Sequence, residues 1–502
     1  HFLGTTDNVP LNFQVNNQKA GRIDSNGPTF LGYQAGNSNT ATNNTGIGFE
    51  ALYSNTTGNW NTANGHRSLY SNTTGIENTT NGFHTLYSNT TGNYNTAIGS
   101  GSLYLNTTAS RNIAIGRNAL FSQSYNNGGT AWNSDNVAIG FEALYSNQPT
   151  VTTNGIANTA IGNFTLRFNT TGNYNTATGV NALYSNTTGS NNTANGLQTL
   201  YSNTTGSSNT ANGVNALYSN TTASRNIAIG YNALFTQSFN NGGTAWNSHN
   251  VAIGYQALYF NQPTATTNGI NNTAIGNFAL FSNTTGSYNT ANGRNALYSN
   301  TTGDFNTTSG FQALFSNTTG SYNTANGLQA LYSNTTGSNN TANGTNALLY
   351  NTTASRNVAI GNNALFSQSF NNGGVAWTSD NVAIGFEALY SNQPTATNNG
   401  IANTAIGNFA LRFNTTGNYN TATGLQALYA NTTGYNNTAN GFQALYSNTT
   451  GFDNTANGVN ALYYNTTGSV NTATGRDALF SNTTGNNNTA SGYQALYSNT
   501  TG

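Results

Sequence analysis

A short repeat runs through almost the whole chain and constrains the fold more than any other feature. The motif Asn-Thr-Ala-x-Gly, whose first Asn we call the anchor, occurs in 25 copies between Asn44 and Asn488. Of the 24 intervals between anchors, 18 are 17 residues long, and the unit reads N-T-A-x-G-x-x-A-L-Y-S-N-T-T-G-x-x. Every copy has a Gly four residues after the anchor and a Leu eight residues after it. So regular a period predicts a solenoid or fibre in which each repeat forms one structural unit.

A second order of repetition lies above the first. The longer intervals come in three pairs, 24 residues and then 22, which begin at Asn112, Asn226 and Asn357. Each pair carries an insert with the sequence N-N-G-G and a Trp, followed by N-Q-P. We interpret residues 44–502 as a β-solenoid of 25 repeats with three insert-bearing blocks. Residues 1–43 have the alternation of ordinary strands and are predicted to form an N-terminal cap or entry segment.

The residue types favour strands over helices. Each unit holds several Gly, Asn and Thr residues and has no apolar stripe at helical spacing. Short strands separated by Gly-rich and Asn-rich turns fit this pattern. We therefore predict an all-β fold, a repetitive parallel β-solenoid (β-roll) with one 17-residue coil per repeat. Identical residues would then stack at the strand spacing of roughly 4.8 Å, Asn on Asn and ring on ring, around a core of Leu and Ala.

The core of one such coil is thin, because it amounts to one Leu, one or two Ala and part of an aromatic ring. Several chains side by side would bury the aromatic columns. A homo-oligomeric fibre is therefore favoured over a single narrow solenoid.

Composition limits the partners and the location of the chain. Charged residues make up 4% of it and the net charge is zero, so binding to nucleic acid or to an anionic membrane is not expected. The absence of Cys rules out disulfides, thiol nucleophiles and zinc–thiolate sites. Met is absent as well, and a chain without oxidisable sulfur side chains suits a secreted, extracellular protein. No apolar run is long enough for membrane insertion. The chain starts at His1 and stops within a repeat at Gly502, as expected of a processed or partial chain.

Catalytic machinery is not predicted, since the few titratable residues fall at scattered positions along the repeats. We predict no enzyme activity, no catalytic or metal site and no cofactor. One charged relationship does have a physical basis. Residues that precede successive anchors should stack across coils and form ion pairs beside the long insert. The alternative is two unrelated solvated charges. The predicted pairs are Arg111 with Asp135, Arg356 with Asp380, and Arg225 with His249.

The inserts and the Asn-Thr-Thr triplets are two further candidates. Loops on a rigid scaffold often carry binding, so Trp132, Trp246 and Trp377 are candidates for contact with a ligand such as a glycan. The alternative is a structural plug on the side of the solenoid. Asn-Thr-Thr, as at Asn203, is also a glycosylation sequon. An Asn ladder in a turn explains the same triplet without any sugar.

Several strings in the repeats resemble a known family. N-I-A-I-G at Asn112 and N-V-A-I-G at Asn136 resemble the head repeats of YadA-type trimeric autotransporter adhesins. The whole unit also resembles long arrays in bacterial surface and tail-fibre-like proteins. For residues 44–502 the resemblance implies a left-handed parallel β-roll, three chains per fibre and adhesion to host or matrix surfaces. The repeats here are longer than the YadA type, and many copies have A-N-G or A-T-G in place of A-I-G.

These observations lead us to expect a structural extracellular filament or adhesin shaft on a bacterial cell surface, which mediates attachment between cells or to surface glycans. The rival expectation is an ice-binding β-solenoid, because regular Thr and Asn ladders on a flat face can match a lattice. A β-helical polysaccharide hydrolase is the third candidate, and it lacks a carboxylate cluster at any one place along the chain.

Overall fold

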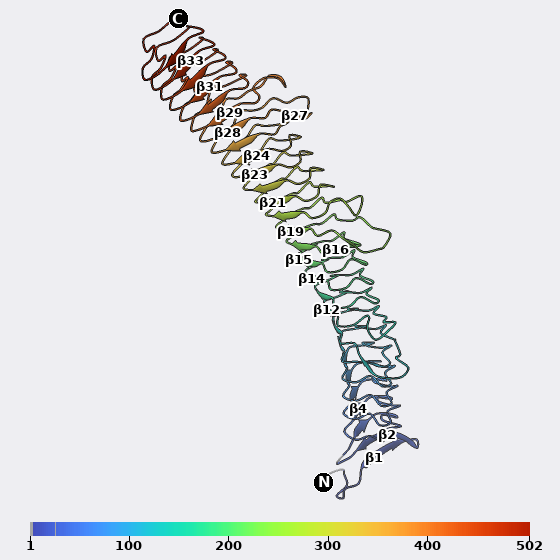
Figure 1. Cartoon of the computed structure of the whole chain (residues 1–502). Coiled ribbons are helices and arrows are strands. Elements are labelled where there is room, and N and C mark those ends of the chain that lie inside the picture. The colour runs from blue at the N-terminus through green and yellow to red at the C-terminus, as the bar shows by residue number, and fades with distance from the viewer. Residues whose placement is uncertain (1–3, 26) are drawn as a thin grey trace. The chain divides into compact units, whose positions relative to one another are not determined.

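The computed structural model describes residues 4–25 and 27–502. The chain divides into an N-terminal unit that ends at His249 and a C-terminal unit that begins at Asn250. Figure 1 shows that each unit is built of short strands and turns that follow one another as successive coils. Over the described residues the regular elements are all β-strands, and the chain forms about 27 turns of about 17 residues each. The predicted all-β parallel β-solenoid with one coil per repeat is therefore confirmed. Assembly into an oligomeric fibre stays a prediction, because the structure contains one chain.

The N-terminal unit opens with a hairpin. Strands β1 (Leu11–Val15) and β2 (Gln18–Ile23) pair antiparallel, and β2 pairs antiparallel with β3 (Thr29–Leu31). Strand β3 already pairs parallel with β4 (Thr45–Ile47), so the solenoid begins one turn before residue 44, where the sequence placed the boundary. The sequence concealed this turn because it has no anchor Asn, although its strand is followed by Gly32 in the same positive-φ conformation as the repeat glycines.

The remaining stacked strands of the N-terminal unit follow at the repeat spacing. They are β5 (Thr62–Asn64), β6 (Thr79–Asn81), β7 (Thr96–Ile98), β9 (Ile113–Ile115), β11 (Val137–Ile139), β12 (Thr159–Ile161), β13 (Thr176–Thr178), β14 (Thr193–Asn195), β15 (Thr210–Asn212) and β17 (Ile227–Ile229). Short strands pair in the inserts, β8 (Ala109–Ser110) with β10 (Trp132–Asn133) and β16 (Ala223–Ser224) with β18 (Trp246–Asn247).

The C-terminal unit repeats this arrangement. Its stacked strands are β19 (Val251–Ile253), β20 (Thr273–Ile275), β21 (Thr290–Asn292), β22 (Thr307–Ser309), β23 (Thr324–Asn326), β24 (Thr341–Asn343), β26 (Val358–Ile360), β28 (Val382–Ile384), β29 (Thr404–Ile406), β30 (Thr421–Thr423), β31 (Thr438–Asn440), β32 (Thr455–Asn457), β33 (Thr472–Thr474) and β34 (Thr489–Ser491). Its insert pair is β25 (Ala354–Ser355) with β27 (Trp377–Thr378).

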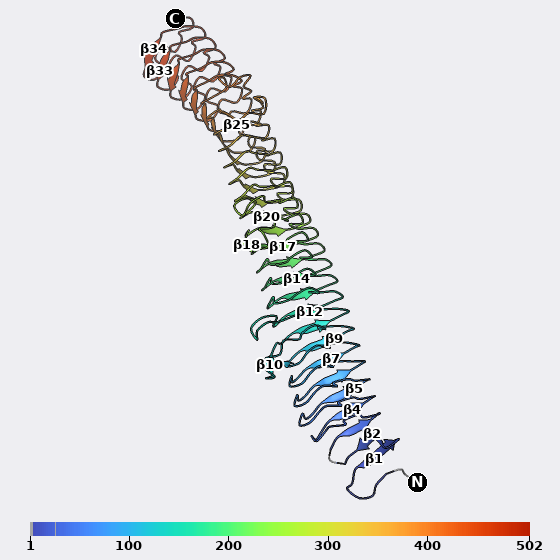
Figure 2. The ribbon, with the colours of Figure 1, turned by 90° about the vertical axis from the view of Figure 1, so that its right-hand side faces the viewer.

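Each repeat strand is three residues long and has one inward side chain. In β14 the central Ala194 is buried, whereas Thr193 and Asn195 are exposed. The parallel register places Thr193 beside Thr210 and Ala194 beside Ala211, so equivalent residues of successive coils form columns. Figure 2 shows the strands of successive coils stacked one above another. The small Ala fits because the opposite wall of the coil lies close to it.

That opposite wall carries the Leu that every repeat contains. Leu200 is fully buried and adopts a φ of 52°, in the left-handed region that non-glycine residues rarely occupy. The same φ recurs at Leu183 and Leu217. Burial of a Leu side chain, worth roughly 1.5–3 kcal/mol, outweighs the strain of about 1–2 kcal/mol. The turn that aims this side chain inward is therefore retained in every coil.

Two ladders of buried Asn flank the hydrophobic core. The anchor Asn192 donates from Nδ2 to Oδ1 of Asn175 in the preceding coil, at 3.1 Å. Asn203, eleven residues after the anchor, donates in the same way to Oδ1 of Asn186, at 2.8 Å. All these side chains are fully buried, so an unmatched amide would cost about 1–3 kcal/mol. The ladders satisfy the polar interior of each coil through its neighbour.

Candidate functional site

The strand face presents the most regular exposed surface of each unit. Thr176 and Thr178 of β13, and Thr193 and Asn195 of β14, flank their buried Ala and are exposed. Successive strands are in register, so these side chains form two columns at the strand spacing of roughly 4.8 Å. Ile or Val replaces the first Thr in the insert-bearing blocks, as at Ile113. The face offers periodic hydroxyl and amide groups and little charge.

A second surface lies just beyond the strand, five residues after the anchor, and we call it the outer apolar column. Most of its apolar members are 39–68% exposed, whereas Phe141 and Val214 are half-buried. Polar residues such as Asn163 and Arg294 interrupt the column. In the N-terminal unit the exposed apolar members are Phe49, Phe83, Val180, Leu197 and Tyr231, and in the C-terminal unit Tyr255, Phe311, Leu328, Phe386, Leu425, Phe442, Val459 and Tyr493. Exposed apolar residues that recur along one line of a protein mark a contact surface.

The three Trp residues of the inserts are packed rather than presented. Trp132, Trp246 and Trp377 are each only 7% exposed. The Trp132 indole packs edge-on against Tyr125, with ring centroids 5.8 Å apart, and β10 pairs parallel with β8. Each indole Nε1 is buried and has no hydrogen-bond partner among the described residues. Ligand contact through these rings stays a prediction, and the burial itself is the packing that a structural plug requires.

The insert loops fold back over earlier coils. Thr91 Oγ1 donates to the Gly129 carbonyl at 2.9 Å, across 38 residues of sequence, and the same bond joins Thr205 to Gly243. A Cβ built on Gly128 or Gly129 would meet nothing within 4 Å, so the tip of the loop faces open space. The tip rather than the Trp ring is thus the exposed part of each insert.

At each insert a Gln takes the place of one Asn of the second ladder. This replacement was not predicted from the sequence. Gln123 stands where other repeats have the second ladder Asn, and its Oε1 accepts from Asn136 Nδ2 and Asn147 Nδ2 at 3.1 and 3.0 Å. Its Nε2 donates to Ser134 Oγ at 2.9 Å. The longer side chain spans the offset that the insert creates. The signal was Gln-Ser in place of Asn-Thr in all three blocks.

The structure brings together the charged residues that were predicted to stack. Nε of Arg111 lies 2.9 Å from Oδ1 of Asp135, and Arg356 and Asp380 repeat this distance. Both side chains of each pair are more than 40% exposed. The third pair, Arg225 Nη1 and His249 Nε2, lies at 3.4 Å. Solvent screens pairs as exposed as these, so they contribute little to stability.

Two other ion pairs are less exposed than these, and the sequence did not predict them. Arg167 and Glu142 approach to 2.7 Å, and Arg412 and Glu387 to 2.6 Å, with the carboxylate side chains only 15% exposed. Both arginines stand where most repeats have Tyr or Phe. Burial opposes the charge of Arg167, but hydrogen bonds to Glu142 and Tyr184 outweigh it, so the pKa of the guanidinium lies above its ordinary value. The sequence contained the signal, since both arginines break the aromatic pattern one coil after a Glu.

The aromatic residues nine positions after the anchor form stacks that we call the ring columns. Tyr184, Tyr201 and Tyr218 stack with centroids 5.0 and 5.2 Å apart and ring planes within 6° of parallel. Each ring is covered by a neighbour on both faces, so its exposed part is its edge. Sugar stacking needs an open ring face, which these columns do not offer.

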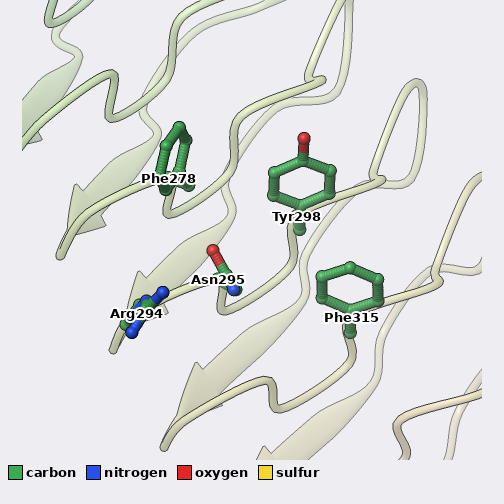
Figure 3. A pocket seen from close by; sticks show the side chains of 5 residues that line it. All are labelled: Phe278, Arg294, Asn295, Tyr298 and Phe315. Atoms are coloured by element: carbon green, nitrogen blue, oxygen red, sulfur yellow. The ribbon is translucent and has the colours of Figure 1, made fainter.

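A shallow hollow interrupts this surface in the C-terminal unit. It measures about 280 Å³ and is lined by Phe278, Arg294, Asn295, Tyr298 and Phe315 (Figure 3). Among the described residues Arg294 has no ion-pair partner and Asn295 has no side-chain hydrogen bond. The Arg294 guanidinium lies 5.9 Å from the centroid of the Phe311 ring. The hollow therefore combines the edges of aromatic rings with a cation that has no carboxylate partner and a free amide, which suits a small ligand that carries a negative charge.

The sequons contribute to the interior rather than to the surface. Asn186, Asn203 and Asn220 are fully buried, and their amides are engaged in the ladder. In the folded chain these amide nitrogens cannot accept a sugar.

Within the part of the chain that the structure describes, no three His, Cys, Asp or Glu side chains gather as a metal ion would require. None of the described residues forms a helix long and apolar enough to cross a membrane. In comparisons with known proteins, no family model matches the chain and no curated protein is similar to it.

Proposed function

We propose that the chain is the shaft of a secreted, extracellular filament that mediates attachment at a bacterial cell surface, and that it is not an enzyme. The observation that carries the proposal is the coil-to-coil ladder of Asn192 and Asn203, which adds one hydrogen-bonded layer every 17 residues. A solenoid of this kind extends by repetition, because each coil contacts only its neighbours. The resemblance to YadA-type adhesins supports the same role.

Other copies of the chain are the proposed partners, three per fibre as the resemblance implies. The outer apolar column supports this, since residues such as Leu197 and Leu328 are 46% exposed and lie along one line of their unit. Side-by-side association would remove them from water.

Sedimentation velocity over a range of concentrations tests this assembly. The unmodified chain is expected to sediment as an oligomer, and the variant Leu197→Glu/Leu328→Glu as a monomer with unchanged circular dichroism. Thr193→Glu on the strand face is the matched control and should leave assembly intact. An unmodified chain that stays monomeric at every concentration would contradict the proposed fibre.

The hollow beside Arg294 is the contact that we propose for surface glycans, specifically for acidic sugars. Full-length chain should bind acidic oligosaccharides more tightly than neutral ones of equal length, and Arg294→Gln should abolish the difference. Arg117 is the matched control, because it sits in the same R-N-A-L-aromatic sequence but follows a coil with Gly101 where the hollow has Phe278. Equal loss in both variants, or no preference for acidic sugars, would exclude the hollow as the contact.

Ice binding is the second candidate, and one observation favours it. The strand face carries exposed Thr and Asn in register, as in β13 and β14, and so presents hydroxyl and amide groups at a fixed spacing. Thermal hysteresis distinguishes the two functions. Ice binding predicts a gap between the melting and freezing temperatures of ice in the presence of the unmodified chain. The gap should disappear in the variant Thr176→Lys/Thr193→Lys/Thr210→Lys and persist in Ser202→Lys. The absence of any gap in the unmodified chain would exclude ice binding.

A further inference from the structure

The ring columns place tyrosines of successive coils directly against one another. Tyr184 and Tyr201 have centroids 5.0 Å apart and planes 1° from parallel, and Tyr429 and Tyr446 match them at 5.0 Å and 2°. Seven such pairs have centroid separations of 5.0–5.2 Å. They are Tyr53–Tyr70, Tyr70–Tyr87, Tyr87–Tyr104, Tyr184–Tyr201, Tyr201–Tyr218, Tyr429–Tyr446 and Tyr446–Tyr463.

The backbone fixes this geometry. Leu200 of the buried core precedes Tyr201, and the Ser202 N–H donates to the Tyr218 carbonyl at 3.0 Å, so each ring is held between hydrogen-bonded coils. The tyrosines are half-buried, and their outer ends reach the surface. Figure 3 shows the hydroxyl of Tyr298, in the same position of its repeat, pointing away from the ribbon. The edge of the phenol is therefore accessible to an oxidant at the surface while its ring partner stays in place.

We propose that neighbouring tyrosines of the ring columns are sites of oxidative dityrosine cross-linking, which joins one coil covalently to the next. The oxidant is hydrogen peroxide acting through a haem peroxidase. Each phenol gives up one electron and one proton and becomes a phenoxyl radical. The two radicals join through a carbon–carbon bond between ortho positions, and both rings regain aromaticity as those carbons lose their protons to the phenolic oxygens. One peroxide and two tyrosines yield one dityrosine and two waters.

Proximity directs this coupling to the stacked neighbour. A partner held at a fixed distance and orientation reacts as if it were present at very high concentration. Radicals on adjacent rings of one column should thus combine with each other before they meet a second chain. The product would link two coils that otherwise depend on hydrogen bonds and packing alone.

The sequence supplies an internal control in the C-terminal unit. There Tyr and Phe alternate in the ring column, through Tyr259, Phe281, Tyr298, Phe315 and Tyr332, with the same stacking at 5.0–5.4 Å. Phe has no phenolic O–H and forms no phenoxyl radical under these conditions. The alternating segment should remain free of cross-links although its geometry matches that of the reactive pairs.

The test is oxidation of the folded full-length chain with a haem peroxidase and limiting peroxide, followed by proteolysis and mass spectrometry. Peptides joined with the loss of two hydrogen atoms are expected at the seven pairs. Tyr201→Phe should remove the joined peptides of Tyr184, Tyr201 and Tyr218 and leave Tyr53–Tyr70 unchanged. Tyr298→Phe is the matched control and should leave the whole pattern unchanged. Circular dichroism establishes that both variants fold.

Mixing isotopically labelled and unlabelled chains separates coupling within a chain from coupling between chains. Joined peptides in which both halves are labelled or both are unlabelled come from one chain and support the proposal. It is overturned if the joined peptides are mainly mixed, if Tyr298 couples as often as Tyr201, or if oxidation proceeds and Tyr184–Tyr201 is not joined.

Discussion

Asn192 and Asn203 donate their side-chain amides to the same acceptor, the carbonyl oxygen of Gly206, at 3.0 and 2.9 Å. Their other amide hydrogens go to Asn175 and Asn186 of the preceding coil. One carbonyl thereby couples the two ladders within a coil, and the ladders couple that coil to its neighbour. Only a side chain with a donor and an acceptor at this length satisfies both demands, which explains the two buried Asn columns.

Replacement of a ladder Asn should loosen its coil. Asn203→Leu removes the bonds to Asn186 and Gly206 and leaves Asn220 without its acceptor, so a local loss of about 2–4 kcal/mol is expected. Hydrogen exchange of the backbone amides around residue 203 measures this loss directly, whereas a global melt averages over many coils. Asn195→Leu on the exposed strand face is the control, and equal exchange in both variants would contradict the ladder's role.

A methyl group on Gly206, whose carbonyl accepts from both ladders, should loosen the coil as much as Asn203→Leu does. A Cβ on Gly206 would lie 2.4 Å from the carbonyl oxygen of Ala223, which is backbone, and 2.5 Å from Asn203 Oδ1, which is held in the ladder by Asn220 Nδ2. Gly206→Ala is therefore expected to accelerate hydrogen exchange in its coil and in the next. Gly128→Ala in the insert tip meets no atom within 4 Å and should cost only about 1 kcal/mol of backbone strain. A larger effect at Gly128 would refute this account.

The two classes of ion pair should differ in strength. Glu142→Gln leaves the half-buried Arg167 unpaired and is expected to cost about 1–3 kcal/mol, whereas Asp135→Asn at an exposed pair should cost less than about 1 kcal/mol. The middle block has Gln256 and Phe281 at the positions of Glu142 and Arg167. The double variant Glu142→Gln/Arg167→Phe should thus recover most of the loss in a denaturant titration. If the double variant is no more stable than Glu142→Gln, the Gln and Phe of the middle block cannot substitute for the ion pair in this coil.

Alkaline pH should weaken the ring columns. Burial, and then the neighbouring Tyr184 and Tyr218, raise the pKa of Tyr201 above its ordinary value of 10.0. Because the folded state holds this proton more tightly than the unfolded state, its contribution to stability is complete below pH 10.0 and is lost as the pH rises through the folded pKa. Thermal unfolding as a function of pH should show this decline, and the slope should be smaller in Tyr201→Phe.

Acid should act on a different residue, His84. Burial lowers its pKa below the ordinary value of 6.5, with help from His66 and Arg67, and its Nε2 is buried without a partner. The unfolded chain therefore binds a proton that the folded chain resists. The stability from the neutral ring is present above pH 6.5 and is lost as the pH falls through the folded pKa. A nuclear magnetic resonance titration should give His84 a midpoint below 6.5, and a midpoint above that value would contradict the burial argument.

The sequence by itself determined everything that follows from stacking identical units. The period placed Thr193 beside Thr210 and Arg111 beside Asp135, because in a parallel, in-register solenoid the neighbour of a residue is found at a fixed sequence offset. Only the tertiary structure decided how the chain turns within a coil. It placed Leu200 in a left-handed conformation, extended Gln123 across an insert, and buried the ring of Trp132 and the side chain of Asn203. Successive coils are related by a translation along the stack, so the neighbours of a residue can be deduced from the repeat spacing. The path of the backbone within one coil cannot, because it depends on which side chains are buried in its narrow interior.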